Sequence, residues 1–139
     1  MTPGNNKPDT VQWKKVAIAI TEDGAISPTH FGDADQLLFA EVRPGEFKIL
    51  ETRPNPVKQV DEERHGSQEK LNQAAGMMKS MNIVATGRLS INFKKMRTEK
   101  NKWPFLTRMD PEPFLDWLKD SLPELEEWFN NPDNTVYRM

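Results

Sequence analysis

Short apolar runs bounded by turn residues predict β-strands in the first half of the chain. Residues 16–21 form a nearly continuous apolar run rich in Val and Ile, which indicates a strand buried on both faces. The polar turn that follows contains Gly24, a residue type that readily adopts a positive φ. Residues 25–27 then predict a brief returning strand.

A Pro-Gly pair at residues 44–45 separates two further apolar stretches and predicts a hairpin. Its strands are expected over residues 37–43 and 47–52. The second strand alternates between apolar and polar residues, so one of its faces is expected to carry Phe47, Ile49 and Glu51. Residues 53–64 hold two prolines and many charges, and they predict a surface loop.

After this loop the apolar residues change to a helical period. A first amphipathic helix is predicted over residues 71–81 from the positions of Leu71, Ala74, Ala75, Met78 and Met81. A short strand is predicted over residues 82–86. Ser90 can cap the next helix, which is expected to turn Phe93 and Met96 inward.

Residues 103–106 predict the last strand, and a helix with Asp110 as N-cap and Pro111 as its first residue follows. Its apolar side is formed by Phe114, Leu115, Trp117, Leu118, Leu122, Leu125, Trp128 and Phe129. Residues 121–124 have the spacing of a capping box, which predicts that the helix restarts there. Trp117, Trp128 and Phe129 are interpreted as core residues rather than as a ligand platform.

The predicted order is three strands, a helix, a strand, a helix, a strand and a helix. Hairpins therefore come first and right-handed βαβ crossovers later, which predicts a single α/β domain with a mixed sheet and helices packed on it. Residues 1–14 are polar and predict a flexible N-terminal arm.

The chain has 139 residues, a formal net charge of -2 and no cysteine. The charge provides no field that would attract nucleic acid or an anionic membrane. The absence of cysteine excludes disulfides, zinc sites with thiolate ligands and clusters held by the protein's own sulfur atoms. With no membrane-spanning run and no apolar stretch of the signal-peptide type near the N-terminus, the sequence predicts a cytoplasmic protein that binds neither membrane nor nucleic acid.

The chain has two histidines, and His30 lies in an exposed polar turn, which makes it the first candidate metal ligand. A neutral imidazole can bind iron or molybdenum, and Asp33 and Asp35 are placed to orient it. The alternative is an ordinary turn histidine whose ring hydrogen-bonds to the local backbone.

The segment VAIAITEDGAISPTHFGDADQLLFAEV at residues 16–42 resembles the start of the dinitrogenase iron–molybdenum cofactor biosynthesis family. The matching residues are Asp23-Gly24, Ser27, His30-Phe31-Gly32 and Ala34, together with His65-Gly66 before the first long helix. The resemblance covers residues 15–122 and leaves 123–139 as a C-terminal helical extension and tail. It implies a ribonuclease-H-like fold.

The resemblance also implies a non-enzymatic carrier of an iron–sulfur or iron–molybdenum–sulfur cluster used in nitrogen fixation. A relative holds a molybdenum–copper sulfide cluster. By this resemblance His30 is the metal ligand, and His65 is a weaker second candidate. Two histidines make a poor permanent site, so the cluster is expected to be held transiently, with metallocofactor assembly or nitrogenase-type proteins as partners.

Arg88 and Ser90 form a second candidate site. Ser90 at a helix N-terminus could help to bind an anionic cluster through backbone N–H groups, with Arg88 adding charge. An ordinary capped helix beside a solvated arginine is the alternative.

A basic run at residues 94–102, with Lys94, Lys95, Arg97, Lys100 and Lys102, is interpreted as a solvated helix face. It leaves a rival function open, a cluster-free structural or regulatory interaction module that acts through this helix and the tail. A two-metal nuclease of the same fold is disfavoured, because the strand at residues 16–21 carries no carboxylate.

Overall fold

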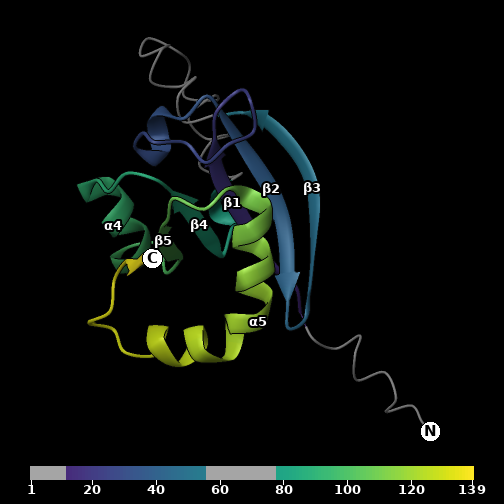
Figure 1. The fold of residues 1–139 in the computed structure, drawn as a ribbon. Coiled ribbons are helices and arrows are strands. Elements are labelled where there is room, and N and C mark those ends of the chain that lie inside the picture. Colours follow the sequence, from purple (N-terminus) through teal and green to yellow (C-terminus); the bar gives the residue numbers. More distant parts are fainter. Residues whose placement is uncertain (1–11, 56–77) are drawn as a thin grey trace, which may run out of the picture.

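The computed structural model describes residues 12–55 and 78–139 and shows a mixed sheet with a helix on each face (Figure 1). The strands are β1 (Lys14–Ile20), β2 (Gln36–Arg43), β3 (Glu46–Pro54), β4 (Ile83–Thr86), β5 (Trp103–Leu106) and β6 (Tyr137–Arg138). The helices are the 3-10 helix η1 (Phe31–Asp33), α4 (Ile91–Thr98) and α5 (Pro111–Phe129).

The strand order is β3-β2-β1-β4-β5-β6. β1, β2 and β3 pair antiparallel, whereas β4, β5 and β6 extend the sheet parallel to β1. This confirms the α/β, ribonuclease-H-like mixed sheet with hairpins first and crossovers later. Most of the helix expected at residues 71–81 lies outside the described residues. Of its described part, residues 78–79 are helical. In the described part of the chain no helix combines the length and apolarity needed to cross a membrane.

β1 is buried on both faces, as its continuous apolar run predicts. Val16, Ile18 and Ile20 face α5, in a core that also takes in β2, β4 and β5. Ala17 and Ala19 face the opposite side, where the core includes Phe31 of η1 and Phe93 of α4. β1 begins at Lys14, the last residue of the range expected for the N-terminal arm.

The hairpin between β2 and β3 differs from the sequence prediction at one point. A β-bulge leaves Leu50 without a partner, because Ala40 pairs with Ile49 and the preceding Phe39 pairs with Glu51. The bulge moves Glu51 to the opposite face from Ile49, so the prediction of a shared face was wrong for Glu51. The returning strand expected at residues 25–27 is also wrong, since a single bridge between Ile20 and Ile26 takes its place.

α5 runs continuously through Pro123 and does not restart at the capping-box spacing, so that expectation was wrong. Proline lacks the N–H that would bond the carbonyl four residues earlier, which belongs to Lys119. Here the Gly45 N–H in the β2–β3 turn donates to that carbonyl at 3.0 Å. Figure 1 shows that α5 bends, and a backbone hydrogen bond lost at a proline is a common cause of such a bend.

The sheet gains a strand that the sequence did not predict. β6 pairs parallel with β5, so residues 103–106 are not the last strand. Tyr137 of β6 packs against Phe105 and Trp128, with ring centroids 5.5 and 4.9 Å apart respectively. Trp117, Trp128 and Phe129 all join the core on the α5 side, which confirms their interpretation as core residues.

Two members of the basic run are not solvated, which corrects the interpretation for these positions. The guanidinium of Arg97 donates to the carbonyl of Phe129, the last residue of α5, and to that of Asn134 in the segment after the helix. Lys102 is 5 % exposed, and its ammonium donates to the Met81 carbonyl at 2.8 Å. Burial lowers the pKa of Lys102, with a smaller contribution from Lys100. Lys94, Lys95 and Lys100 are exposed, as the sequence predicted.

We expect Arg97→Met to lower the free energy of unfolding by about 1–2 kcal/mol, because it removes charged donors from the Phe129 carbonyl at the end of α5 and from the Asn134 carbonyl beyond it. Urea unfolding followed by circular dichroism measures the change. Lys94→Met, on the exposed side of the same helix, is the matched control and is expected to stay within about 0.5 kcal/mol of wild type. Equal effects of the two substitutions would contradict the capping role.

Candidate functional site

The candidate site lies where two loops leave the sheet at the carboxyl ends of β1 and β4. These neighbouring parallel strands lead in opposite directions, because β1 continues to β2 and β4 continues through α4 to β5. Open α/β sheets bind ligands at such a switch point. His30 on the first loop and Arg88 on the second pair through a single parallel bridge at this switch point.

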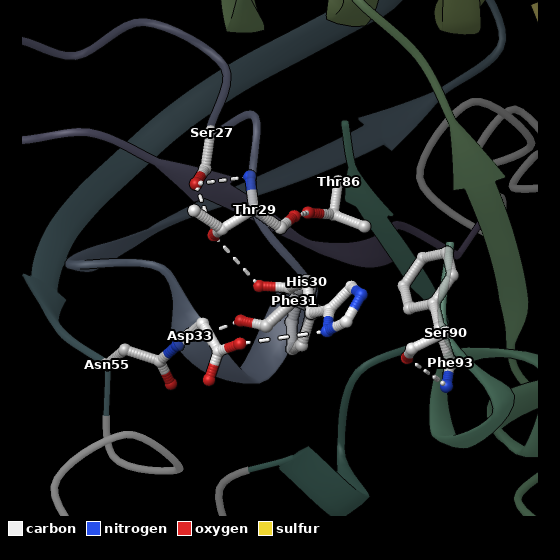
Figure 2. Close-up of polar contacts among 9 residues, drawn as sticks. All are labelled: Ser27, Thr29, His30, Phe31, Asp33, Asn55, Thr86, Ser90 and Phe93. Atoms are coloured by element: carbon white, nitrogen blue, oxygen red, sulfur yellow. Dashed lines mark hydrogen bonds and ion pairs between the residues drawn. The ribbon is translucent and has the colours of Figure 1, made fainter. Parts of the chain in front are cut away.

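His30 directly precedes η1, and this short helix sets the surroundings of its ring. The Asp33 N–H donates to the His30 carbonyl at 2.9 Å, which folds Asp33 back toward the imidazole. The His30 Nδ1 atom then lies 3.6 Å from Asp33 Oδ2, a weak electrostatic contact in solvent (Figure 2). The His30 side chain remains 41 % exposed. A carboxylate on the Nδ1 side leaves Nε2 as the ring nitrogen for a metal.

Buried polar side chains hold the loop under His30 in place. The Thr86 hydroxyl, at the end of β4, donates to the Thr29 carbonyl at 2.8 Å. The Ser27 and Thr29 hydroxyls lie 2.7 Å apart, and the Thr29 hydroxyl also donates to the His30 carbonyl at 3.0 Å. Figure 2 shows these contacts as a chain that ends at the backbone of His30. Hydrogen bonds therefore connect the turn before His30 to the end of β4.

Asn55, just after β3, closes the other side of this loop. Its side chain is 1 % exposed, and its amide donates to the Phe31 carbonyl at 2.9 Å and to the Ala34 carbonyl at 3.1 Å. Its backbone N–H donates to the Asp35 carbonyl at 3.1 Å. A single side chain thus satisfies two carbonyls, one on the first residue of η1 and one on the residue just after it.

The buried polar residues of the described chain concentrate on this loop. Five polar or charged residues are buried among the described residues, namely Ser27, Asn55, Thr86, Lys102 and Thr107. Three of the five, Ser27, Asn55 and Thr86, hydrogen-bond to the segment that carries His30. Burial of a polar group costs free energy unless its hydrogen bonds are satisfied. The hydrogen bonds of these three residues therefore favour one conformation of the loop.

A cavity of about 200 Å³ opens beside the His30 ring. It is lined by residues 30–33 of the loop and by Ser90, Asn92, Phe93 and Met96 at and within α4. The rings of Phe31 and Phe93 pack with centroids 5.8 Å apart and give this region an apolar base. Ser90 Oγ accepts the Phe93 N–H at 3.1 Å, which confirms Ser90 as the helix cap.

The structure brings together three of the four site residues predicted from the sequence. His30 and Ser90 line the same cavity, and Arg88 is exposed and pairs with His30 through the backbone. The fourth, His65, lies outside the described residues. Of the two carboxylates expected to orient His30, Asp33 faces the ring, whereas Asp35 contributes its carbonyl to Asn55.

The donor set is sparse. Within residues 12–55 and 78–139, no three histidine, aspartate or glutamate side chains gather closely enough to hold a metal ion. Sequence reasoning missed Asn55 and Thr86 as supports of the loop, and it placed Met96 in the core without expecting it beside His30.

Gly87 lies where the two loops contact each other, and the space beside its Cα atom has no room for a side chain. Its N–H donates to the Ser27 carbonyl at 3.0 Å, and a Cβ atom added here would lie 2.5 Å from that carbonyl oxygen. The close approach that Gly87 permits is between two segments of the protein's own backbone.

We expect Gly87→Ala to destabilise the protein by about 1–3 kcal/mol, because one of the two backbones has to move to relieve the overlap. Thermal unfolding measures the loss, and the backbone NMR shifts of residues 27–30 should change with it. A stable variant with unchanged shifts at these residues would contradict the close packing of the two loops.

Comparison with known proteins adds one finding. The model of a protein family described as dinitrogenase iron-molybdenum cofactor matches residues 13–110. The match includes the whole of the loop around His30, the turn from Gly87 to Ser90 and α4. No curated protein matches the chain.

Proposed function

This chain belongs to the dinitrogenase iron–molybdenum cofactor family, and on that premise we propose that it is a non-enzymatic carrier with a metal–sulfur cluster as its cargo. The cargo is of the iron–sulfur or iron–molybdenum–sulfur type and binds through His30. The protein acts in cytoplasmic metallocofactor assembly, and its partners are the proteins that donate the cluster and those that accept it.

The observation that supports this proposal most strongly is the mounting of His30. Its ring is exposed at a switch point of the sheet, while three buried polar residues fix the backbone that carries it. An ordinary turn histidine needs no such support, since its ring would be satisfied by water. A ligand that must meet a preassembled cluster benefits from being held in position beforehand.

The size and chemistry of the cavity fit a cargo better than a resident cofactor. At about 200 Å³ it is smaller than the roughly 300–1,000 Å³ of usual small-molecule sites, so a cluster would stay partly outside it. A cluster held at one nitrogen keeps its remaining face available to an acceptor protein. Weak attachment through His30 also allows release, which a transfer protein requires.

The charges around the cavity are compatible with an anionic cargo. Arg88 is exposed and its backbone pairs with His30, and α4 begins beside the cavity with its N-terminal end. Both features favour negative charge nearby. Asp33 opposes this field and instead acts on the ring of His30, where a carboxylate strengthens a metal-bound imidazole.

The rival function, a cluster-free interaction module, depends on the basic helix and the tail. The structure uses much of both internally. Arg97 donates to the end of α5, Lys102 is buried, and Tyr137 of the tail packs on the aromatic core. These contacts leave fewer groups for a partner than the sequence alone suggested.

Anaerobic incubation with isolated iron–molybdenum cofactor, followed by size-exclusion chromatography and metal analysis, tests the carrier function. We expect iron and molybdenum to elute with the protein in the ratio of the cofactor, at about one cluster per chain. Folded protein that elutes free of metal under these conditions would overturn the proposal and favour the interaction module.

A further inference from the structure

The cavity beside His30 contains a sulfur donor that no part of the proposed function uses. Met96 lines it from the second half of α4, together with Asn92 and Phe93. Residues 92, 93 and 96 are spaced four and three apart, so they lie on one face of the helix. Because the chain has no cysteine, the thioether of Met96 is the only sulfur among the described residues that line this cavity.

We infer that Met96 is a second donor beside His30, so that the cavity selects thiophilic metal centres over hard cations. This inference rests on the proposed function, since it concerns the same cavity and assigns the class of metal that the cargo presents. An imidazole nitrogen with a thioether sulfur suits soft or borderline metals such as Cu(I). Hard ions such as Mg²⁺ and Mn²⁺ prefer several carboxylate and carbonyl oxygens, and among the described residues that line this cavity Asp33 has the one carboxylate.

Two features of Met96 make it suitable for this role. It is only partly buried where it packs on the core, so part of its side chain is accessible. Its unbranched side chain also adjusts to a ligand at low cost. The helix below it is anchored at its start by the Ser90 cap and by buried Phe93. A flexible side chain on a fixed helix thus lines the same cavity as His30 on its fixed loop.

Silver(I) in chloride-free buffer is the appropriate probe, because it is soft, redox-stable and without thiol competitors in this protein. Calorimetric titration of the full chain is expected to show one tight Ag⁺ site that Mn²⁺ does not occupy. His30→Ala should abolish this site, and Met96→Leu, which preserves volume, should weaken it about tenfold or more. With ¹³C-methyl-labelled methionine, the Met96 resonance should shift before the others.

Met81→Leu is the matched control. Met81 packs on the same core face but is absent from the lining of this cavity, so its loss should leave Ag⁺ affinity unchanged. Equal Ag⁺ affinity of Met96→Leu and wild type, or no Ag⁺ site in wild type, would overturn the inference. If either result occurred while wild type still took up iron–molybdenum cofactor, the proposed function would stand without the second donor.

Discussion

His30→Ala is expected to reduce the uptake of iron–molybdenum cofactor to background while leaving the fold unchanged. The substitution removes the imidazole of a residue that lines the cavity. It keeps the contacts that shape the loop, because these use the backbone carbonyl of His30, which accepts from the Asp33 N–H and the Thr29 hydroxyl. Binding and stability are therefore separable at this residue.

Metal analysis after anaerobic incubation measures uptake, and urea unfolding measures stability. We expect the free energy of unfolding to stay within about 0.5 kcal/mol of wild type, since the lost contact with Asp33 is solvent-exposed. Asn92→Ala changes the same cavity without removing an imidazole or thioether donor and is expected to retain uptake. Stoichiometric cofactor uptake by folded His30→Ala would show that His30 is not the cluster ligand.

The second large effect is expected at Asn55. Asn55→Ala should lower the free energy of unfolding by about 2–4 kcal/mol, because the Phe31 and Ala34 carbonyls lose their amide donor beneath the loop. We also expect weaker cofactor uptake, since η1 and the turn before it would lose their fixed position. Urea unfolding and the uptake assay applied to the same variant measure the two effects.

Asn82→Ala provides the control for Asn55. The Asn82 side chain accepts one hydrogen bond from the Lys15 N–H, at 2.8 Å, in an exposed position. Water can replace that bond, so we expect a loss of about 1 kcal/mol or less. An Asn55 variant as stable as the Asn82 variant would show that the buried amide does not support the His30 loop.

Local patterns predicted most of the fold, because strands and helices of this chain follow their own hydrophobic period. The buried run of β1, the Pro-Gly hairpin and the Ser90 cap all lie where the sequence placed them. The errors arise where a distant partner intervenes. Pro123 does not end α5, because the Lys119 carbonyl that it leaves without a helical donor accepts the Gly45 N–H of the β2–β3 hairpin.

Two further errors have the same origin. The bulge at Leu50 depends on how β3 pairs with β2, and alternation within one strand cannot reveal it. β6 is two residues long and exists through its pairing with β5. A segment this short has no period of its own, so only the three-dimensional neighbourhood identifies it as a strand.

For the candidate site, the sequence supplied the ligand but not its support. His30 was conspicuous because histidines are scarce in this chain and because the loop resembles a family motif. Asn55 is 24 residues from Phe31, and Met96 is farther still from His30, so no motif spacing connects them. Their contributions follow from the crossing of loop, strand and helix at one edge of the sheet.

The most direct test of the central claim is pulsed electron paramagnetic resonance of cofactor-loaded protein labelled with ¹⁵N in the histidine rings. The His65→Ala variant carries His30 alone and is measured beside wild type. With the cluster in a paramagnetic state, we predict a ¹⁵N coupling to the cluster in both proteins. A bound cluster without that coupling, or a coupling lost in His65→Ala, would contradict ligation by His30.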